Sequence, residues 1–313
     1  MSAVVVATGY GGPENLAVID TPTPDPGTGE VRFAVRAAGV NPVDVKAYSG
    51  AFGTDPSKLP MRLGAEAAGV VTAVGPQAVG PAGPIAVGDE VIAYRTSGAY
   101  AEQLVVPATE VVPKPARLSW EQAGGLLLTG ATAIHALETV GVGAGDTVLV
   151  HGGAGGVGLI AVQLAAARGA RVIATASPGK HEVLARFGAT PVAYGDGLAE
   201  RVRALGPVDA AIDTVGTDEA VDVSLDLVPD RARIVTIAAF GRAPQAGIRL
   251  IGGGPGADPG DEIRSAARLQ LTAAVEAGRL EVVVAGAYSF AHAAEAHRAI
   301  ASGHTTGKIV LVP

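Results

Sequence analysis

The residues with the clearest chemical meaning are the glycines Gly153, Gly155 and Gly158, which form a G-x-G-x-x-G set. They follow the apolar run Val148–Val150 and open an Ala- and Leu-rich stretch that ends at Gly169. A strand, a glycine turn and a helix in this order are typical of a dinucleotide-binding site. The first glycine permits a tight turn, the second lets the backbone approach a pyrophosphate, and the third lets the helix pack against the strand. The alternative is an ordinary tight turn, because a chain with 44 glycines contains such spacings by chance.

The turn is predicted to hold the phosphates of the dinucleotide. Free N–H groups and the positive end of the helix dipole make a helix start a site for anions. The residues expected to contact the cofactor here are Gly153, Ala154, Gly155, Gly156, Val157 and Gly158.

The end of the following strand indicates which dinucleotide is preferred. A site for NAD usually has Asp or Glu about 20 residues beyond the glycines, where it accepts from the ribose 2′-hydroxyl. This chain has the run Ala174–Ser177 there, followed by Pro178-Gly179-Lys180. The Ser177 hydroxyl and the Lys180 ammonium suit a 2′-phosphate, so the sequence predicts NADPH. The alternative for Lys180 is a solvated charge at the start of the next helix.

Length and composition favour a cytoplasmic protein of two domains. The chain has 313 residues, of which 48% are hydrophobic, and a formal net charge of −7. The acidic balance disfavours nucleic acid or an anionic membrane as a partner. No stretch reaches the roughly 20 apolar residues of a membrane span, and Met1–Val6 lacks the basic segment of a secretory signal. The chain has no cysteine, which excludes disulfides, thiolate metal sites and a cysteine nucleophile.

The hydrophobic pattern changes near Lys114-Pro115. Before it, short valine-rich runs between Pro and Gly predict a mainly β domain. After it, Ser119 and Gln122 form a predicted capping box that starts a helical stretch as far as Leu137. Beyond the glycine turn, strands alternate with helices, as in a parallel doubly wound sheet. The expected strands are Val4–Val6, Val31–Ala37, Ala68–Val74, Glu90–Ala93, Glu102–Val106, Arg171–Thr175, Val208–Asp213 and Arg233–Ala238, and the expected helices are Gly179–Phe187, Glu219–Leu227 and Asp261–Ala277.

The last part of the chain contains a glycine-rich loop and a final strand. Gly252–Gly260 is predicted to be a loop, either a plain connection or a mobile cover over a site. Phe290–Ser302 is predicted to be a helix, and Lys308–Val312 a strand that could return to the β domain.

Several short motifs outside the glycine turn are also informative. They are Ala38–Asp44, Gly64–Val71, Gly88–Val91, Gly98–Glu102, Asp213–Gly216 and Gly307–Leu311. Together these residues resemble the zinc-independent, quinone-oxidoreductase-like branch of the medium-chain dehydrogenase/reductase superfamily, across essentially the whole chain. The resemblance implies an α/β fold with a GroES-like, mainly β catalytic domain at residues 1–116 and 284–313. It also implies a Rossmann NADPH-binding domain, with a doubly wound parallel sheet, at residues 117–283.

The assignment to the zinc-independent branch follows from the absence of metal ligands. Zinc alcohol dehydrogenases of this superfamily carry a Cys next to the Asn-Pro position and a His in a Gly-His-Glu motif. This chain has Val43 or Asp44 and Ala65 at those positions. A catalytic zinc typically has three protein ligands, and Glu66 alone does not supply them. The six histidines are scattered without ligand spacing, so no metal site is predicted; His151 is interpreted as a strand-end residue.

The resemblance implies a reductase that transfers hydride from NADPH to a small molecule, either a quinone or the C=C bond of an α,β-unsaturated carbonyl compound. It places Asn41 near the nicotinamide, Thr129 by the ribose and nicotinamide, and Tyr194 at the adenine end. It also matches Ser177 and Lys180 to contacts with the 2′-phosphate.

The catalytic groups are less constrained by the sequence. Without a metal, N–H or O–H donors must meet the acceptor's carbonyl oxygen. Asn41 and Tyr48 are the candidates for this role, and the proton comes either from Tyr48 or from solvent. The family often has aromatic residues shortly after the Asn-Pro turn, and in this chain Lys46, Tyr48 and Phe52 occupy that stretch.

Two other functions remain open. An enoyl-thioester reductase would need basic residues for a carrier's phosphate. Lys58, Arg62 and Arg95 are candidates, although ordinary surface charge is the commoner explanation for such residues. A non-catalytic, NADPH-binding sensor would bind the cofactor and reduce no acceptor. A homodimer is expected from the family, but Gly247–Gly260 lacks the regular strand that often pairs two subunits.

Overall fold

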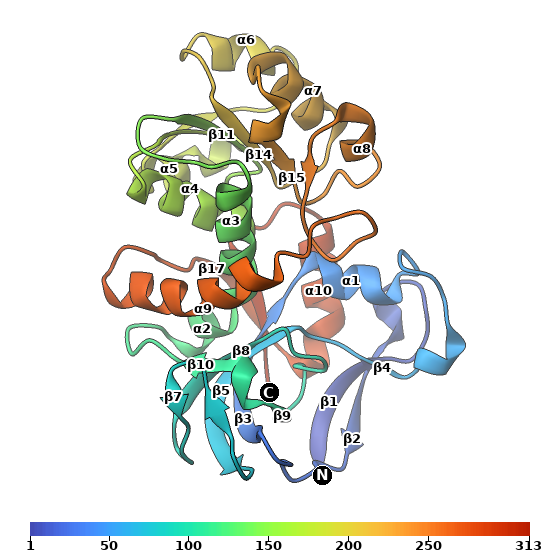
Figure 1. Ribbon diagram of the computed structural model, residues 1–313. Coiled ribbons are helices and arrows are strands. Elements are labelled where there is room, and N and C mark those ends of the chain that lie inside the picture. Colours follow the sequence, from blue (N-terminus) through green and yellow to red (C-terminus); the bar gives the residue numbers. More distant parts are fainter. The chain divides into compact units, whose positions relative to one another are not determined.

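Strand pairing changes from mainly antiparallel to parallel along the chain, and the chain folds as two units (Figure 1). The computed structural model describes all residues, Met1–Pro313. Unit 1 contains residues 1–128, 268–278 and 282–313, and unit 2 contains residues 129–267 and 279–281. None of the helices is both long enough and apolar enough to cross a membrane.

Unit 1 is built around a seven-stranded sheet of order β10-β8-β5-β3-β18-β17, with β9 also paired to β3. Smaller sheets have the orders β2-β1-β4 and β6-β7. Strand β18 pairs antiparallel with β3, with Ile309 opposite Val40, so the predicted return of the last strand to the β domain is confirmed. The strands of unit 1 are β1 (Ser2–Ala7), β2 (Leu16–Thr21), β3 (Glu30–Val40), β4 (Met61–Arg62), β5 (Glu66–Val74), β6 (Val79–Gly80), β7 (Gly83–Pro84), β8 (Glu90–Tyr94), β9 (Gln103–Pro107), β10 (Val111–Pro113), β17 (Val284–Ser289) and β18 (Lys308–Val312).

The core of unit 1 follows from alternation along its strands. In β3 the side chains of Val31, Phe33 and Val35 are buried, as expected when every second residue faces the core. The same apolar cluster includes Ala293 and Ala296 from a C-terminal helix. The helices of this unit are α1 (Pro42–Tyr48), α2 (Trp120–Gly124) and α10 (Ala293–Ala301), with the 3₁₀ turns η1 (Pro13–Asn15), η2 (Pro56–Lys58), η3 (Ala108–Glu110) and η6 (Phe290–His292).

The segment after the β domain packs on unit 1. The Ser119–Gln122 capping box at the start of α2 is confirmed. A Cβ on Gly124 would lie 2.8 Å from the Ala37 carbonyl oxygen, so a glycine is needed for α2 to approach β3 this closely. The predicted single helical stretch is broken after α2, and α3 (Leu127–Thr139) begins after Gly125 and Leu126. The predicted division into functional domains at 116/117 and 283/284 stays a prediction.

Unit 2 contains a six-stranded, wholly parallel sheet of order β13-β12-β11-β14-β15-β16. Counted along the unit, this is the order 3-2-1-4-5-6 of a dinucleotide-binding sheet, so the predicted doubly wound fold is confirmed. The strands are β11 (Thr147–His151), β12 (Arg171–Thr175), β13 (Ala189–Val192), β14 (Ala210–Asp213), β15 (Ile234–Thr236) and β16 (Arg249–Leu250).

Helices flank this sheet on both faces. In Figure 1, α4 and α5 lie on one side of the strands, and α6 and α7 lie on the other. Right-handed crossovers put them there, because the chain reverses its direction across the sheet after β13. The connections are α4 (Gly156–Ala167), η4 (Pro178–Lys180), α5 (His181–Arg186), α6 (Leu198–Arg203), α7 (Asp218–Leu227), η5 (Arg231–Arg233) and α8 (Ala243–Ala246), and α9 (Asp261–Glu276) divides between the two units.

The sequence missed β13 and α6 in this unit. Strand β13 has only four residues and contains Pro191, so its sequence does not show the apolar alternation that predicts a strand. It is an edge strand, where the missing N–H of a proline is tolerated. The predicted loop Gly252–Gly260 is confirmed as a loop, closed by a bridge between Ile251 and Asp258.

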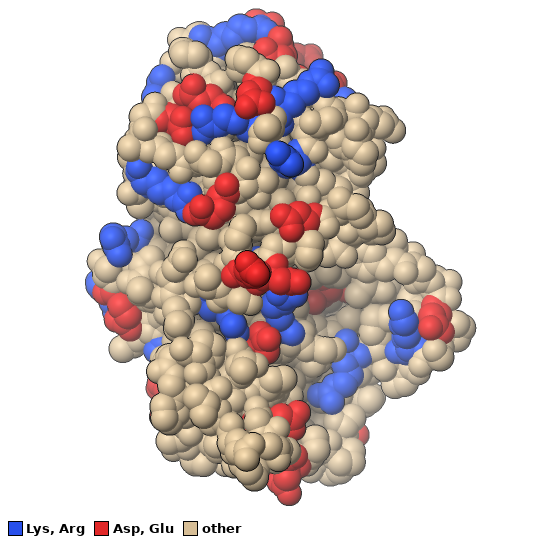
Figure 2. Space-filling view, viewed as in Figure 1, with Lys and Arg blue, Asp and Glu red and all other residues tan.

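Charged side chains of both signs are mixed on the face shown in Figure 2, with no large patch of one sign. Several exposed groups are paired across elements. Arg242 contacts both Asp218 and Asp222 of α7, and Arg203 of α6 contacts Asp226. That face thus lacks the basic stripe that is typical of nucleic-acid binding.

Candidate functional site

The three motif glycines of unit 2 differ in what a side chain at each position would meet. A Cβ on Gly153 would lie 2.7 Å from the Ala174 Cβ, and a Cβ on Gly158 would lie 2.2 Å from the Gly152 carbonyl oxygen. Gly155 differs, because its Cβ would meet only the Gly152 oxygen, at 3.4 Å. Gly153 and Gly158 therefore allow close packing within the protein, whereas Gly155 faces open space that a ligand can approach.

The start of α4 provides unpaired backbone donors. Gly155 is the N-cap of this helix, and no side chain caps it. Gly156 and Val157 are partly exposed, whereas Ala154 is buried. Because the first N–H groups of a helix have no intrahelical partner, the segment that was predicted to contact the cofactor presents donors for an anion.

The turn is tied to the end of β12 by hydrogen bonds that the sequence does not reveal. The Gly153 N–H donates to the Thr175 carbonyl oxygen at 2.9 Å, and the Gly152 N–H donates to the Thr175 hydroxyl at 3.1 Å. Thr175 is therefore a positioning residue for the glycine turn.

The predicted contacts for a 2′-phosphate lie at the same edge of the sheet. Ser177 and Lys180, both partly exposed, follow the carboxyl end of β12. Tyr194 follows β13, whose Val192 pairs with Thr175, and its side chain is 56% exposed. Partial burial lowers the pKa of Lys180. Thr129 also belongs to unit 2, where it is buried on α3.

His151 ends β11, as predicted. It is buried, and its Nε2 lies 3.1 Å from the Ser224 hydroxyl. Burial lowers the pKa of His151 to about 4, so the ring is neutral at physiological pH. The neighbouring Asp213 accepts hydrogen bonds from the Val215 and Gly216 N–H groups, each at 2.9 Å, which shapes the turn after β14.

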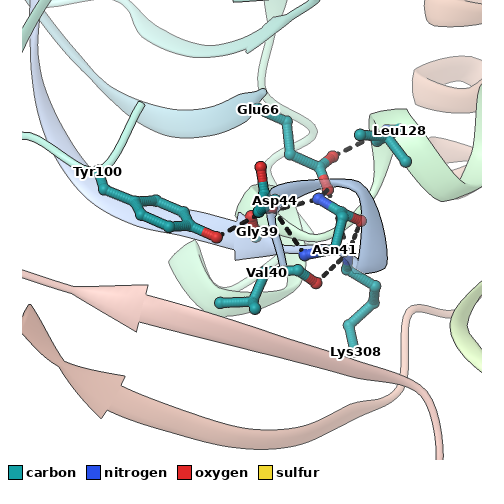
Figure 3. A network of polar contacts seen from close by, with 8 residues as sticks. All are labelled: Gly39, Val40, Asn41, Asp44, Glu66, Tyr100, Leu128 and Lys308. Carbon is teal, nitrogen blue, oxygen red and sulfur yellow. Dashed lines mark hydrogen bonds and ion pairs between the residues drawn. The ribbon is translucent and has the colours of Figure 1, made fainter. Parts of the chain in front are cut away.

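A second polar cluster lies inside unit 1, around Asn41 (Figure 3). Asn41 follows β3 directly and is the N-cap of α1, with Pro42 in the first turn, where proline is favoured. Its Nδ2 donates to Glu66 Oε1 at 3.1 Å and to the Gly39 carbonyl oxygen at 3.2 Å. Its Oδ1 accepts from Lys308 Nζ at 2.5 Å. Figure 3 shows Asn41 between Glu66 and Lys308.

Glu66 and Lys308 form a buried ion pair in this cluster. Glu66 Oε1 lies 3.1 Å from Lys308 Nζ, and the two side chains are 0% and 4% exposed. Glu66 Oε2 accepts from the Leu128 N–H at 2.8 Å. Both carboxylate oxygens are thus hydrogen-bonded, which a buried charge requires.

Asp44 extends the cluster toward the core of unit 1. Its Oδ2 accepts from the Asn41 N–H and from the Tyr100 hydroxyl, each at 2.9 Å. Burial raises the pKa of Asp44 to about 6, although both hydrogen bonds oppose the shift. Burial, and then the charge of Asp44, holds the pKa of Tyr100 well above its usual value.

Changing Asp44 to Asn should alter the pH dependence of stability. The unfolded carboxyl titrates near 3.8 and the folded one near 6, so between these values the folded state holds the proton more tightly. The contribution of this group to the free energy of unfolding of the wild type therefore falls by about 2 kcal/mol as pH rises from 4 to 6. We expect Asp44→Asn to lack this fall in calorimetric scans across that range. Parallel curves for the two proteins would contradict the prediction.

Tyr48, the second predicted catalytic residue, lies in the core of unit 1. It has no exposed surface, and its hydroxyl lies 2.9 Å from Nδ1 of His297 on α10. Burial, and then the charge of Asp44, raises the pKa of Tyr48 to about 12. This location favours a structural role, and proton donation by Tyr48 stays a prediction.

The roles of Glu66, Tyr100 and Lys308 in this cluster were not predicted from the sequence, although each residue lies in one of the short motifs and Glu66 was considered as a lone metal ligand. The available signal was a charged residue inside an apolar segment: Glu66 stands among alanines, and Lys308 opens the run Ile309–Val312. A charge in such a segment is rarely buried unless it is paired. Pairing the two residues required the fold, because they are 242 positions apart.

The donor set around Glu66 does not fit a zinc ion. No group of three or more His, Cys, Asp or Glu side chains could hold a metal anywhere in the structure. The place beside Glu66 Oε1 is taken by the Lys308 ammonium and the Asn41 amide. A positive charge at 3.1 Å would repel a divalent cation.

Comparisons with known proteins agree with this architecture. The model of the alcohol dehydrogenase GroES-like domain matches residues 27–116, and a model described as zinc-binding dehydrogenase matches residues 187–311. A quinone oxidoreductase of Pseudomonas aeruginosa is 35% identical, over 97% of this chain and 97% of the relative. The chain belongs to the quinone oxidoreductase-like group of the medium-chain dehydrogenase/reductase superfamily. The predicted family and fold class are therefore confirmed.

Solved structures of this superfamily have the same fold. A mycobacterial protein in complex with NADPH is 34% identical, with a TM-score of 0.86 over 100% of both chains. The CurK enoyl reductase is 25% identical, with a TM-score of 0.86 over 99% of both chains. The chain is thus an oxidoreductase of this superfamily, and its relatives include proteins named for two different acceptors.

Proposed function

We propose that this chain is an NADPH-dependent reductase that transfers hydride, without zinc, to a quinone or to the C=C bond of an α,β-unsaturated carbonyl compound. The observation that carries the proposal is the cradle at Gly155, where the backbone is open and the start of α4 is uncapped. The NADPH complex of the mycobacterial relative supports the choice of cofactor.

Residues of unit 2 would hold the cofactor. The segment Gly153–Gly158 would bind the pyrophosphate through backbone N–H groups, and Ser177 and Lys180 would meet the 2′-phosphate. Thr129 and Tyr194 keep their proposed places at the nicotinamide and adenine ends. When bound, NADPH supplies the hydride; the chain orients the reactants and excludes water.

Asn41 keeps its proposed place near the nicotinamide, with a narrower chemical role. Both amide hydrogens already have acceptors, Glu66 Oε1 and the Gly39 carbonyl oxygen. Direct donation from Asn41 to an acceptor's carbonyl oxygen would have to break one of these bonds. We therefore favour a role for Asn41 in shaping the site, and solvent as the source of the proton.

The first experiment is an anaerobic assay of NADPH oxidation with benzoquinones, enones, enals and enoyl thioesters, with NADH in parallel. Turnover of quinones or enones supports the proposal. Turnover of acyl thioesters alone would favour the alternative of an enoyl-thioester reductase. The structural similarity to the CurK enoyl reductase supports this alternative. Tight NADPH binding without turnover of any acceptor would favour a sensor.

Lys180→Ala should weaken the preference for NADPH over NADH. Loss of a charged hydrogen bond to a phosphate costs roughly 10- to 100-fold in affinity, and NADH has no 2′-phosphate to lose. We expect the ratio of kcat/KM values for the two cofactors to fall by that factor. Arg186→Ala is the matched control, because this nearby cation is 54% exposed and pairs with Glu281. An unchanged ratio in Lys180→Ala would remove Lys180 from the site.

The expected homodimer is also a proposal. Strand β16 has two residues and lies at the edge of the parallel sheet, so it offers a short edge for a second chain. Light scattering coupled to size-exclusion chromatography would test the stoichiometry.

A further inference from the structure

We propose that the ammonium group of Lys308 is a built-in cation that orients Asn41 and Glu66, and that Lys308 is thereby a positioning residue for the reductase site. Only the kinetic part of this inference rests on the proposed function. The structural part concerns three oxygen atoms inside unit 1 and has its own tests.

The cradle around the ammonium is complete. Nζ donates to the Val40 carbonyl oxygen at 3.2 Å, to Asn41 Oδ1 at 2.5 Å and to Glu66 Oε1 at 3.1 Å. An ammonium has three N–H donors, so every donor has one acceptor. Lys308 is only 3% exposed, and such a burial is tolerated because the charge is paired and fully hydrogen-bonded.

The ammonium decides which way the Asn41 amide points. The two ends of an asparagine amide differ only in being donor or acceptor, and an ammonium can only donate. Oδ1 must therefore face Lys308, which turns Nδ2 toward Glu66 and Gly39. A neutral side chain at position 308 would remove this constraint and leave the Glu66 carboxylate buried without its countercharge.

The backbone holds Lys308 in place from two sides. Strand β18 begins at Lys308 and pairs with the end of β3, one residue before Asn41. The aliphatic stem lies along Gly125, whose hypothetical Cβ would be 3.1 to 3.2 Å from three carbons of Lys308. A side chain at position 125 would push the stem, so the glycine at this position fits the presence of the lysine.

With the ammonium in this position, no metal ion is needed to balance the charge of Glu66. The three oxygens and the negative charge of Glu66 form a site for a cation, and the chain fills it with its own side chain. Truncation of the lysine should therefore create a cavity that takes a small alkylammonium ion.

The test uses Lys308→Ala in the full chain, with propylammonium as the added cation. This ion replaces the atoms from Cγ to Nζ that the substitution removes. Breaking a buried pair should lower the melting temperature by roughly 10 °C, and misplacement of Asn41 should lower kcat about 100-fold. We expect millimolar propylammonium to recover part of both losses. Propanol and tetramethylammonium should recover neither, because one lacks the charge and the other lacks N–H donors.

Two further variants separate positioning from stability. The charge-balanced Glu66→Gln/Lys308→Met should regain most of the melting temperature but not kcat, because no group fixes Asn41. Lys114→Ala is the control for the loss of an ordinary pair, since Lys114 pairs with Glu90 at 3.0 Å outside this cluster, and it should keep kcat. Native kcat in Lys308→Ala or in the double variant would overturn the positioning role.

A spectroscopic measurement tests the inference even if the wild type reduces no acceptor. The side-chain amide resonances of Asn41, assigned through their loss in Asn41→Ser, should move in Lys308→Ala and return with propylammonium. Resonances that do not move in Lys308→Ala would overturn the inference, independently of the proposed function.

Discussion

Replacing Gly155 with alanine is expected to weaken NADPH binding at least 10-fold without a loss of thermal stability. A Cβ at this position would meet nothing in the protein closer than 3.4 Å, and the backbone angles of Gly155, φ −75° and ψ 173°, are open to any residue. The methyl group would instead occupy the space through which a pyrophosphate approaches the start of α4. Fluorescence titration with NADPH and a thermal scan measure the two quantities.

The neighbouring glycine provides the contrast. In Gly158→Ala the new Cβ would lie 2.2 Å from the Gly152 carbonyl oxygen, so α4 must shift against the turn. We expect a loss of about 3 kcal/mol of unfolding free energy together with the loss of binding. Gly143→Ala, with no atom within 4 Å of its Cβ, should change neither. NADPH binding by Gly155→Ala with wild-type affinity would refute a pyrophosphate at this position.

Mild acid is expected to remove the stability that one buried neutral histidine contributes to each unit. Burial lowers the pKa of His151 in unit 2 and of His297 in unit 1 to about 4. Between pH 6.5 and 4 the unfolded chain binds a proton at each ring that the folded chain does not. The contribution of each histidine to the free energy of unfolding is fully present above pH 6.5 and falls by about 3 kcal/mol as pH is lowered through this window. In unit 1 the protonation of Asp44 opposes part of this fall.

Single variants assign this loss to its source. We expect His297→Gln and His151→Gln to lose about 2 kcal/mol less than the wild type between pH 7.5 and pH 5, each in its own unit. Differential scanning calorimetry at the two pH values measures the difference. The exposed His304 serves as the control, and His304→Gln should follow the wild type. If all four proteins lose the same stability, neither buried ring controls the acid response.

Local patterns in the sequence determined much of the fold. The capping box of Ser119 and Gln122 and the glycine turn Gly153–Gly158 involve residues within a few positions of each other. Their geometry follows from backbone conformations and hydrogen bonds that a short segment makes by itself. The alternation of strands and helices beyond residue 146 similarly indicated the parallel sheet, since the period of apolar residues reveals which face is buried.

Only the tertiary structure decided which polar groups meet. Lys308 and Asn41 are 267 positions apart, and Tyr48 and His297 are 249 apart. No periodicity links such residues; the pairing of β18 with β3 and the packing of α10 on the core bring them together. The sequence could therefore predict a nucleotide site made by neighbouring residues. It could not show that Tyr48 is buried, or that the ammonium of a lysine from the last strand lies beside Glu66, because these properties depend on contacts between distant segments.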